Sequence, residues 1–375
     1  MKIAFVSDAA FPWHVGGVEK TERMEAEALA RTNEVHFFSF MWKGMRKEFT
    51  DKKIQYHCSH YLTDNEFYRH KRRSVREAIL FSLMVWRLFN YRFDVVQANA
   101  FPILHLPVVK FYCRINRCKL VFDVAEVWSR EHWIGYLGPI AGRVVSWYAN
   151  WALSGADAYI SNPGLTEKGL VNIGVKKRKI HVFTPIVDDR EMRSVKAGQH
   201  KGLVVISGRL IKEKRFDKWL GVIKEVSEIT KVKAIIVGDG PEKANIKTTI
   251  NALGLQKVAT VRGYFKSKKE IYKLVKSASL LLNMSEREGL SALTLESISL
   301  GTPVVLPDYS PIPDMVKEMC VASSEEQLPD VISKIINGDK RKFIRNIKNL
   351  DRFKTSNIGS FYNMLFKGMK EKSVY

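Results

Sequence analysis

The stretch SEREGLSALTLESISLGTPVV occupies residues 285–305 and follows a short apolar run, LLLNM. The apolar run predicts a strand, Ser291 is a candidate N-cap, and ALTLESISL predicts a helix that stops at Gly301. The residues TPVVLP then predict a second strand. The stretch also places Glu288 in the loop and Glu296 inside the helix. It therefore predicts a strand-loop-helix-strand unit that carries two carboxylates.

Predicted strands and helices alternate in the same way over the whole chain. Short runs rich in Val, Ile, Leu and Phe lack polar alternation, which is typical of strands covered on both faces. The segments between the runs are long enough for helical crossovers between parallel strands. The runs are KIAFVS, EVHFFSF, DVVQANA, KLVFDVAE, AYISNP, KIHVFTP, GLVVISG, KAIIVGDG, ATVRGYF, LLLNMS and TPVVLPD. We therefore expect an α/β protein with parallel sheets.

The alternation is interrupted at TPIVDDREMRSVKAGQHKG, residues 184–202, where no apolar period persists and proline and glycine collect. A chain of 375 residues has room for two domains of ordinary size. The end of the chain has helical spacing and no strand after it. The predicted parts are a Rossmann-like domain over 1–185, a linker over 186–202, a second Rossmann-like domain over 203–355 and a helix over 356–375.

Charge and cysteine content narrow the class of protein. The chain has 61 Lys and Arg against 39 Asp and Glu, a formal net charge of +22. This excess favours acidic partners such as nucleic acid, anionic lipid or phosphorylated small molecules. The sequence shows no helix-turn-helix, zinc-finger or RNP signature, so nucleic acid is the weaker alternative. Its four cysteines have no zinc or redox spacing, which indicates free thiols in a reducing compartment.

Three features bear on membranes. The first apolar run turns polar at Ser7 and Asp8, which predicts a strand rather than a signal peptide. No run reaches the roughly 18 apolar residues of a membrane span, and AILFSLMVWRLFN, residues 78–90, predicts a buried helix instead. Residues 31–119 hold 17 basic and 7 acidic residues, and the stretch 69–92 joins a basic cluster to a helix with Phe, Met and Trp. That stretch predicts either contact with an anionic membrane or a core helix with a solvated start. We expect a cytoplasmic protein, with a peripheral position on the inner face of the cell membrane as the alternative.

Two loops could bind an anion. Gly16 and Gly17 stand between the first strand and an amphipathic helix, where backbone N–H groups can approach a phosphate; the alternative is a plain turn. Arg209 and Lys214 follow the strand GLVVISG, and an arginine fork with a lysine ammonium suits a diphosphate. Ordinary surface charge is the alternative for this pair.

The remaining features separate ligand classes. The turn at residues 238–240, Gly-Asp-Gly, lacks the third glycine of a dinucleotide fingerprint, so a nicotinamide site is poorly supported. Amides of Gly289 and Leu290 could meet a phosphate while Glu288 or Glu296 accepts sugar hydroxyls, which suits a sugar nucleotide. Solvated glutamates are the alternative. The two carboxylates have no metal-ligand partners nearby in the sequence, which argues against a zinc site.

Several of these stretches occur together in one known family. The chain resembles glycosyltransferase family 4, the retaining GT-B enzymes that use nucleotide sugars. The resemblance rests on GGVE, GADAYISNPGLTEKGL with KIHVFTPIVD, SGRLIKEK, VGDGPE, VRGYF and EREGLSALTLESISLGTPVV, in that order. The last is the most specific, because it keeps the family's two glutamates with seven residues between them and its Gly-x-Pro-Val-Val ending. The resemblance implies two Rossmann-like domains with parallel sheets facing an interdomain cleft, and a last helix that returns to the first domain.

The resemblance also implies roles for particular residues. Arg209 and Lys214 would clamp the diphosphate and stabilise its charge as it leaves, so no metal and no cofactor are required. Glu288 would contact the donor sugar, and Glu296 the ribose hydroxyls. Backbone around Tyr264 would meet the base. The implied donor-binding residues are Gly16, Gly17, Glu126, Tyr264, Gly289, Leu290 and Glu296, and the implied catalytic residues are Arg209, Lys214 and Glu288.

The sequence departs from the family pattern at three places. Many members have His-Asp near the fourth strand, where this chain has FDVAEVWSRE, so Glu126 is the first counterpart and Asp123 the second. The glycine that usually follows the clamp lysine is Arg215, and the common Phe-Gly after Glu-Gly is Leu290-Ser291. The first departure concerns the sugar and the acceptor, and the others concern the shape of the loops.

The predicted function is a retaining transfer of a sugar from a nucleoside-diphosphate sugar to a glycan or lipid-linked acceptor of cell-surface polysaccharide or glycoconjugate synthesis. The basic stretch 69–92 lies in the acceptor-side domain, which suggests an acceptor at an anionic membrane. The alternatives are another GT-B enzyme, either a nucleotide-sugar epimerase or a sugar phosphorylase, and a nucleic-acid-binding protein.

Overall fold

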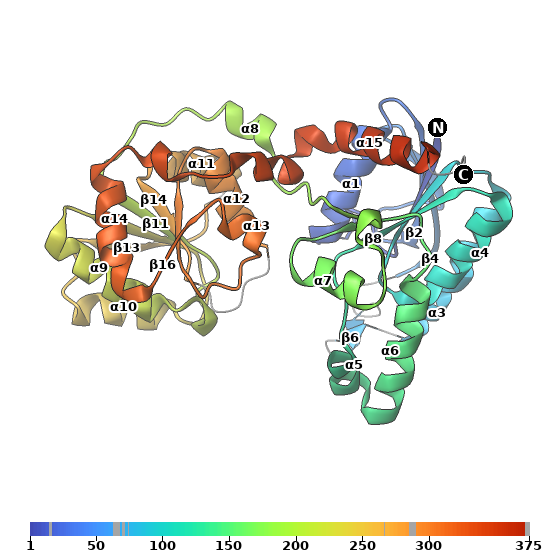
Figure 1. The fold of residues 1–375 in the computed structure, drawn as a ribbon, viewed down its shortest axis with the longest axis horizontal. Coiled ribbons are helices and arrows are strands. Elements are labelled where there is room, and N and C mark those ends of the chain that lie inside the picture. Colours follow the sequence, from blue (N-terminus) through green and yellow to red (C-terminus); the bar gives the residue numbers. More distant parts are fainter. Residues whose placement is uncertain are drawn as a thin grey trace. The chain divides into compact units, whose positions relative to one another are not determined.

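The chain folds into two compact units, each built around its own sheet (Figure 1). The first unit joins Met1–Thr184 to Asn357–Tyr375, and the second is Pro185–Ser356. This computed structural model describes residues 1–14, 17–62, 68–69, 72–73, 75–265, 267–284 and 290–371, of which 68, 69, 72, 73, 213, 370 and 371 by backbone alone.

The first unit contains an eight-stranded sheet in the order β10-β9-β8-β7-β1-β2-β4-β3. Neighbouring strands are parallel except β3 and β4 at one edge, which are antiparallel. The strands are β1 (Lys2–Val6), β2 (Glu34–Met41), β3 (Glu48–Asp51), β4 (Ile54–Tyr61), β7 (Val95–Asn99), β8 (Lys119–Val124), β9 (Ala158–Ser161) and β10 (Ile180–Val182). A separate antiparallel pair consists of β5 (Tyr68–Arg69) and β6 (Arg72–Arg73). The central strand β1 is buried on both faces, which explains its unbroken apolar run.

Helices cover both faces of this sheet (Figure 1). They are α1 (Gly17–Leu29), α3 (Val75–Met84), α4 (Leu106–Asn116), α5 (Arg130–Leu137), α6 (Pro139–Leu153), α7 (Leu165–Asn172) and α15 (Ile358–Glu371). The 3₁₀ helix η1 (Val85–Asn90) continues α3. The segment 78–90, predicted to be a buried helix, is buried on one side only. Phe81, Met84 and Leu88 enter the core, whereas Ile79 and Leu83 are exposed.

The second unit contains a six-stranded, fully parallel sheet in the order β13-β12-β11-β14-β15-β16. This is the strand order 3-2-1-4-5-6 of a Rossmann fold. The strands are β11 (Leu203–Ser207), β12 (Lys233–Val237), β13 (Ala259–Arg262), β14 (Leu280–Leu282), β15 (Val304–Pro307) and β16 (Val321–Ser323). The helices are α8 (Asp189–Arg193), α9 (Phe216–Ile229), α10 (Lys243–Ala252), α11 (Lys268–Ser277), α12 (Ala292–Ser299), α13 (Asp314–Lys317) and α14 (Leu328–Asn337).

The unit predicted from residues 280–305 is confirmed where the structure describes it. Ser291 is the N-cap of α12, and its Oγ accepts a hydrogen bond from the N–H of Thr294 at 3.4 Å. Gly301 has a φ of +78°, a conformation that glycine adopts without strain, and β15 begins three residues later. The local signals in the sequence were therefore sufficient to place this helix between its two strands.

The segment 186–202, predicted to be a linker, belongs to the second unit. Val187, Met192 and Val195 are buried in one of its hydrophobic clusters, and α8 lies between them in the chain. The N–H of Val187 also donates to Phe353 O at 2.8 Å. The sequence pattern does not indicate this packing, because these three apolar residues are too widely and irregularly spaced to show a period.

The last helix, α15, belongs to the first unit. Its apolar residues Ile358, Tyr362, Leu365 and Phe366 lie in the same buried cluster as β1 and β7. The hydroxyl of Tyr362 donates to Glu25 Oε2 of α1 at 2.8 Å. A side chain of the C-terminal helix thus bonds to the first helix of the chain.

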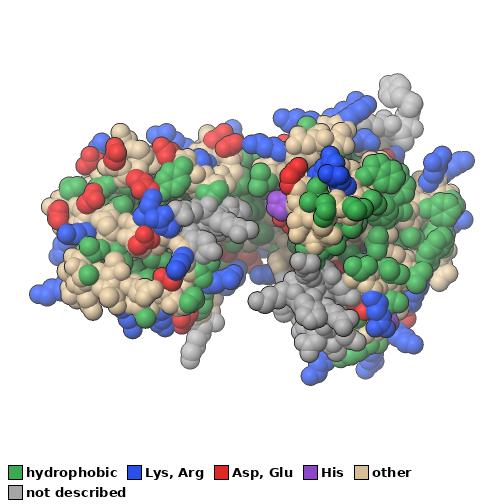
Figure 2. Space-filling view, turned by 90° about the horizontal axis from the view of Figure 1, so that it is seen from below, with side chains coloured by type: hydrophobic (Ala, Val, Ile, Leu, Met, Phe, Trp, Pro, Cys, Tyr) green, Lys and Arg blue, Asp and Glu red, His purple; other side chains and the backbone are tan. Residues whose placement is uncertain are grey.

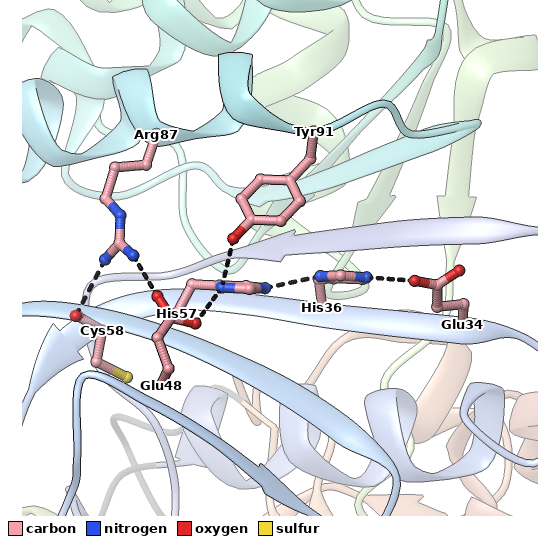
Figure 3. Close-up of polar contacts among 7 residues, drawn as sticks. All are labelled: Glu34, His36, Glu48, His57, Cys58, Arg87 and Tyr91. Atoms are coloured by element: carbon pink, nitrogen blue, oxygen red, sulfur yellow. Dashed lines mark hydrogen bonds and ion pairs between the residues drawn. The ribbon is translucent and has the colours of Figure 1, made fainter.

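One edge of the first sheet is held by a row of polar side chains (Figure 3). His36 Nδ1 and His57 Nε2 are 2.7 Å apart, and the outer ring nitrogens face carboxylates. Glu34 Oε1 lies 2.9 Å from His36 Nε2, and Glu48 Oε2 lies 2.6 Å from His57 Nδ1. Burial lowers the pKa of both histidines. Arg87 of η1 pairs with Glu48, so the row also fastens η1 to the edge strands.

Candidate active site

Three of the predicted residues follow parallel strands of the second sheet. The strand order reverses between β11 and β14, and all strands are parallel, so their carboxyl ends share this edge. Arg209 follows β11, Tyr264 follows β13, and Leu290 lies at the start of α12 after β14. The fold therefore brings these three sequence-predicted residues to the edge where open α/β sheets bind ligands.

The loop after β11 holds the two predicted clamp residues. Arg209 is exposed and Lys214 is half-buried. A Cβ added to Gly208 would lie 3.5 Å from Lys214 Cε, so the lysine side chain packs over the glycine at the end of β11. Both cationic side chains thus belong to one short loop at the carboxyl end of β11. A hollow of about 540 Å³ is lined by residues that include Lys212 and Arg215 of the same loop.

The Gly-Asp-Gly turn after β12 supports the same loop. Gly238 and Gly240 have φ values of +153° and +156°. A Cβ at Gly238 would lie 1.9 Å from Gly208 O, and a Cβ at Gly240 would lie 2.4 Å from Leu210 O. Leu210 N–H also donates to Asp239 O at 2.9 Å. These glycines therefore let two backbone segments touch, and they position the loop of Arg209 and Lys214.

Glu296 is buried in α12 and bonded from the neighbouring helix. The hydroxyl of Tyr272 donates to its Oε1 at 2.8 Å, and Lys268 Nζ donates to the same oxygen at 3.2 Å. Burial and the Glu296 charge raise the pKa of Tyr272. The carboxylate is thus held in one orientation by two side chains of α11.

Several predicted residues of this unit lie next to α12 or outside the described chain. Leu290 is half-buried and packs against the core of the unit. Asn283 Nδ2 donates to Thr294 Oγ1 at 3.2 Å, which ties the end of β14 to α12. Tyr264 is exposed. Glu288 and Gly289 lie outside the described residues.

In the first unit, Gly17 begins α1, and an added Cβ there would meet nothing within 4 Å. The start of the helix is therefore open to a ligand on that side. The first turn also holds Glu19, whose Oε1 lies 3.3 Å from His14 Nδ1. Gly16 lies outside the described residues.

Buried carboxyl groups lie between α1 and the carboxyl ends of β7 and β8. Asn99 Nδ2 donates to Glu22 Oε1, and Gln97 Nε2 donates to Glu25 Oε2, both at 3.0 Å. Burial, followed by the charge of Asp123, raises the pKa of Glu22 well above its usual range and that of Glu25 to about 8. Burial raises the pKa of Asp123 to about 7. The surroundings of these carboxyl groups therefore favour their protonated forms.

The two alternatives for the acceptor-side carboxylate differ in exposure. Asp123 is the penultimate residue of β8, is half-buried and faces the buried carboxyl groups, whereas Glu126 is exposed. Glu126 Oε2 accepts a hydrogen bond from Trp128 Nε1 at 2.8 Å. Trp128 also lines an open hollow of about 460 Å³ with His132 and Tyr136. Glu126 is thus the more exposed of the two.

Sequence reasoning missed the residues that orient the predicted site. Lys268 and Tyr272 hold Glu296, and Tyr362 bonds to both Glu25 and Gln97. Their positions in amphipathic helices carry no signal of a polar contact. A buried glutamate on a predicted inner helix face was the one available hint, because such a group needs a partner.

The fold defines the class of protein. Two units with parallel sheets, one in Rossmann strand order and one built around a buried β1, are the architecture of the GT-B glycosyltransferases. A galactosyltransferase of the lipopolysaccharide outer core, WaaB, has a TM-score of 0.67 at 17% identity, covering 98% of this chain and 99% of that one. Anabaena Alr3699/HepE in complex with UDP and glucose has a TM-score of 0.60 at 16% identity, covering 98% and 100%.

Family models identify the chain more closely. The model described as glycosyl transferases group 1 matches residues 187–350, and the model described as Glycosyltransferase Family 4 matches residues 15–191. The protein belongs to glycosyltransferase family 4, as its resemblance predicted.

Two curated relatives match part of the chain. The amylovoran biosynthesis glycosyltransferase AmsK of Erwinia amylovora is 27% identical over 165 residues, which cover 41% of this chain and 40% of that protein. The sulfoquinovosyl transferase SQD2 of Arabidopsis thaliana is 28% identical over 138 residues, which cover 36% and 26%. The match thus spans less than half the length of either relative.

Proposed function

We propose that the protein is a retaining glycosyltransferase that moves a sugar from a nucleoside-diphosphate sugar to a glycan or lipid-linked acceptor of cell-surface polysaccharide or glycoconjugate synthesis. The observation that carries this proposal is the loop of Arg209 and Lys214 at the carboxyl end of β11, beside the reversal of strand order. The name of AmsK, an amylovoran biosynthesis glycosyltransferase, supports the acceptor class. The HepE complex with UDP and glucose makes a UDP-sugar the first donor to test.

The second unit would bind the donor. Arg209 and Lys214 would place two positive charges on the diphosphate, and the amides of Gly289 and Leu290 at the start of α12 would meet its oxygens. Tyr272 holds Glu296 through Oε1, and Oε2 would accept hydrogen bonds from the ribose hydroxyls.

Other predicted residues would complete the site. Glu288 would contact the donor sugar, and backbone around Tyr264 would meet the base. Gly16 and Gly17 would direct amides toward the donor from the first unit. Glu126 would stand on the acceptor side in place of the family's His-Asp pair.

The chemistry needs few groups from the protein. The bond between the anomeric carbon and the phosphate oxygen breaks, and its electrons stay on the departing diphosphate. The acceptor oxygen attacks from the same face, and its proton passes to the departing phosphate. Arg209 and Lys214 would stabilise the charge that develops there, so in this proposal no metal is needed and transfer should continue in EDTA.

A second part of the proposal concerns location. The stretch 69–92 would bring the acceptor side to an anionic membrane at the cytoplasmic face. Of its side chains that the structure describes, Arg76 and Arg92 are exposed, which supports an electrostatic contact. Among the described residues, no helix is long and apolar enough to cross a membrane. Flotation with vesicles of phosphatidylcholine, with and without phosphatidylglycerol, tests this part; protein that stays out of both vesicle fractions contradicts it.

The donor site is tested by thermal shift with UDP-, GDP- and ADP-sugars. One donor should raise the melting temperature of the parent, and Lys214→Ala should lose that rise. Lys212→Ala is the matched control, because Lys212 is an exposed lysine of the same loop and is not one of the predicted clamp residues. Equal donor shifts in the parent and in Lys214→Ala would overturn the site.

Glu296 requires its own control, since it also supports the fold. Glu296→Ala should lose the donor-induced shift, whereas Tyr272→Phe should lower the melting temperature without donor and keep most of that shift. Product analysis by NMR then tests retention. Epimerised or phosphorolysed donor without any glycan acceptor would favour the other GT-B activities instead.

A further inference from the structure

Exposed apolar side chains concentrate on one part of the first unit. In the part of the chain that the structure describes, twenty large apolar side chains are exposed, and eleven of them lie between Val75 and Trp151. Ten of the eleven belong to α3 with η1, α4 and α6. They are Val75, Ile79, Leu83, Trp86, Phe111, Ile115, Ile140, Val144, Trp147 and Trp151. Single exposed apolar residues are ordinary on a protein surface, but a cluster of this size marks a contact surface.

The spacing of these residues makes continuous stripes. On α6, the side chains at positions 140, 144, 147 and 151 recur every three or four residues, so they share one side of the helix. Ile140 is 80% exposed and Trp147 is 70% exposed. On α3 and η1, positions 75, 79, 83 and 86 recur in the same way. Each stripe is the side of its helix that the core does not cover.

Contacts between the helices join the stripes into one surface, which we call the α3-α4-α6 face. The ring of Trp86 packs on the ring of Phe111 with their centroids 6.1 Å apart. On the other side of α4, Lys110 Nζ lies 4.8 Å from the centroid of the Trp151 ring and donates to Trp151 O at 3.0 Å. Hydrophobic side chains gather over these helices in Figure 2, with Lys and Arg beside them.

The charge of the α3-α4-α6 face has one sign. The sequences of α4 and α6 contain no Asp or Glu, and the single acid of α3, Glu77, is buried. The same helices expose Arg76, Arg114 and Arg143. Tryptophan rings and arginine stems suit the boundary between lipid headgroups and acyl chains, and the missing carboxylates suit anionic headgroups.

We propose that the α3-α4-α6 face lies in the surface of an anionic bilayer, with the stripe of α6 inserted among the acyl chains and the arginines at the headgroups. This extends the membrane contact proposed above for 69–92, on which it rests for the choice of partner. It moves the main anchor, however, to α4 and α6, outside that stretch. Arg87, inside the stretch, is paired with Glu48 at the edge of the sheet (Figure 3).

The test uses vesicles of phosphatidylcholine, with and without phosphatidylglycerol, and the full chain. The parent should float with the anionic vesicles, and brominated acyl chains should quench its tryptophan fluorescence. Val144→Glu and Trp147→Glu should each lower vesicle binding at least tenfold. Arg114→Gln with Arg143→Gln should weaken binding to anionic vesicles only. Leu165→Glu is the matched control: Leu165 is 87% exposed on α7 of the same unit, outside the face, and binding should be unchanged.

Three results would overturn the proposal. Equal vesicle binding by Val144→Glu, Leu165→Glu and the parent would show that the α6 stripe is not the anchor. A parent dimer in light scattering that Val144→Glu converts to a monomer without altering flotation would assign the face to a second copy of the chain. Loss of vesicle binding in the Arg76→Gln variant and in no other variant would confine the membrane contact to residues 69–92. Donor-induced thermal shifts are measured in the same variants, so failure of the donor site is seen separately.

Discussion

At the scale of the residue, Arg215 shows how a departure from the family pattern can strain the backbone. It follows Lys214 at the start of α9 and has φ 48° and ψ 47°, the left-handed region that disfavours a side chain. Its half-buried guanidinium lies 3.3 Å from the exposed carboxylate of Asp217, and an ion pair at the surface contributes little. The backbone at this position therefore has the conformation that explains a glycine in related sequences.

Replacing Arg215 separates the backbone effect from the ion pair. Arg215→Gly and Arg215→Ala both lose the contact to Asp217, but only glycine relieves the left-handed strain. We expect the glycine variant to be more stable than the alanine variant by about 1 kcal/mol in urea denaturation. Equal stabilities would mean that the loop relaxes out of the left-handed region in the alanine variant.

At the scale of the element, the Gly-Asp-Gly turn determines where the loop of Arg209 and Lys214 lies. An alanine at Gly238 would bring its Cβ within 1.9 Å of Gly208 O, so one of the two backbone segments must move. We expect Gly238→Ala to lower the free energy of unfolding by about 2–3 kcal/mol and to abolish the donor-induced thermal shift.

Gly221→Ala is the control for the turn prediction. Gly221 lies inside α9, and an added Cβ there would meet nothing within 4 Å, so alanine should stabilise the protein by about 0.5–1 kcal/mol. A Gly238→Ala variant that kept both its stability and its donor shift would show that the turn does not position the loop.

Strands were predictable where burial on both faces made their sequences continuously apolar. All eleven apolar runs of the sequence correspond to strands, because central parallel strands are covered on both faces. Among the strands of the two main sheets, β3, β4 and β16 were missed. β4 reads IQYHCSHY, whose polar residues serve the histidine row, and β16 has only three residues at a sheet edge. β3 and β16 are edge strands with one neighbour each, so their sequences need not be apolar.

The site was less predictable than the fold. The position of Arg209 follows from strand order, which a sequence of alternating strands and helices implies. The hydrogen bonds of Tyr272 and Lys268 to Glu296 do not follow from strand order, because they depend on how α11 and α12 are rotated against each other. Helical periodicity gives the buried side of each helix but not which polar group on that side meets which.

At the scale of the whole molecule, the two ends of the sequence meet through buried carboxyl groups. The hydroxyl of Tyr362 of α15 lies 2.8 Å from Glu25 Oε2 of α1 and 2.7 Å from Gln97 Oε1 of β7. Glu25 and Asp123 are protonated in the folded protein at a pH where both would be ionised in the unfolded chain. Folding of the first unit is therefore linked to proton uptake.

The sign of this linkage follows from the pKa values. Burial, then the charge of Asp123, raises the pKa of Glu25 from 4.5 to about 8, so its contribution is complete below pH 4.5 and is lost as the pH rises toward 8. The stability of the first unit should fall over this range, followed by hydrogen exchange in α15. Glu25→Gln should make the fall smaller, with the remainder due to Asp123 and Glu22. Tyr362→Phe should shift the fall to higher pH, because its hydroxyl bond lowers the pKa of Glu25. A pH dependence that is the same in Glu25→Gln and in the parent would exclude Glu25 as its source.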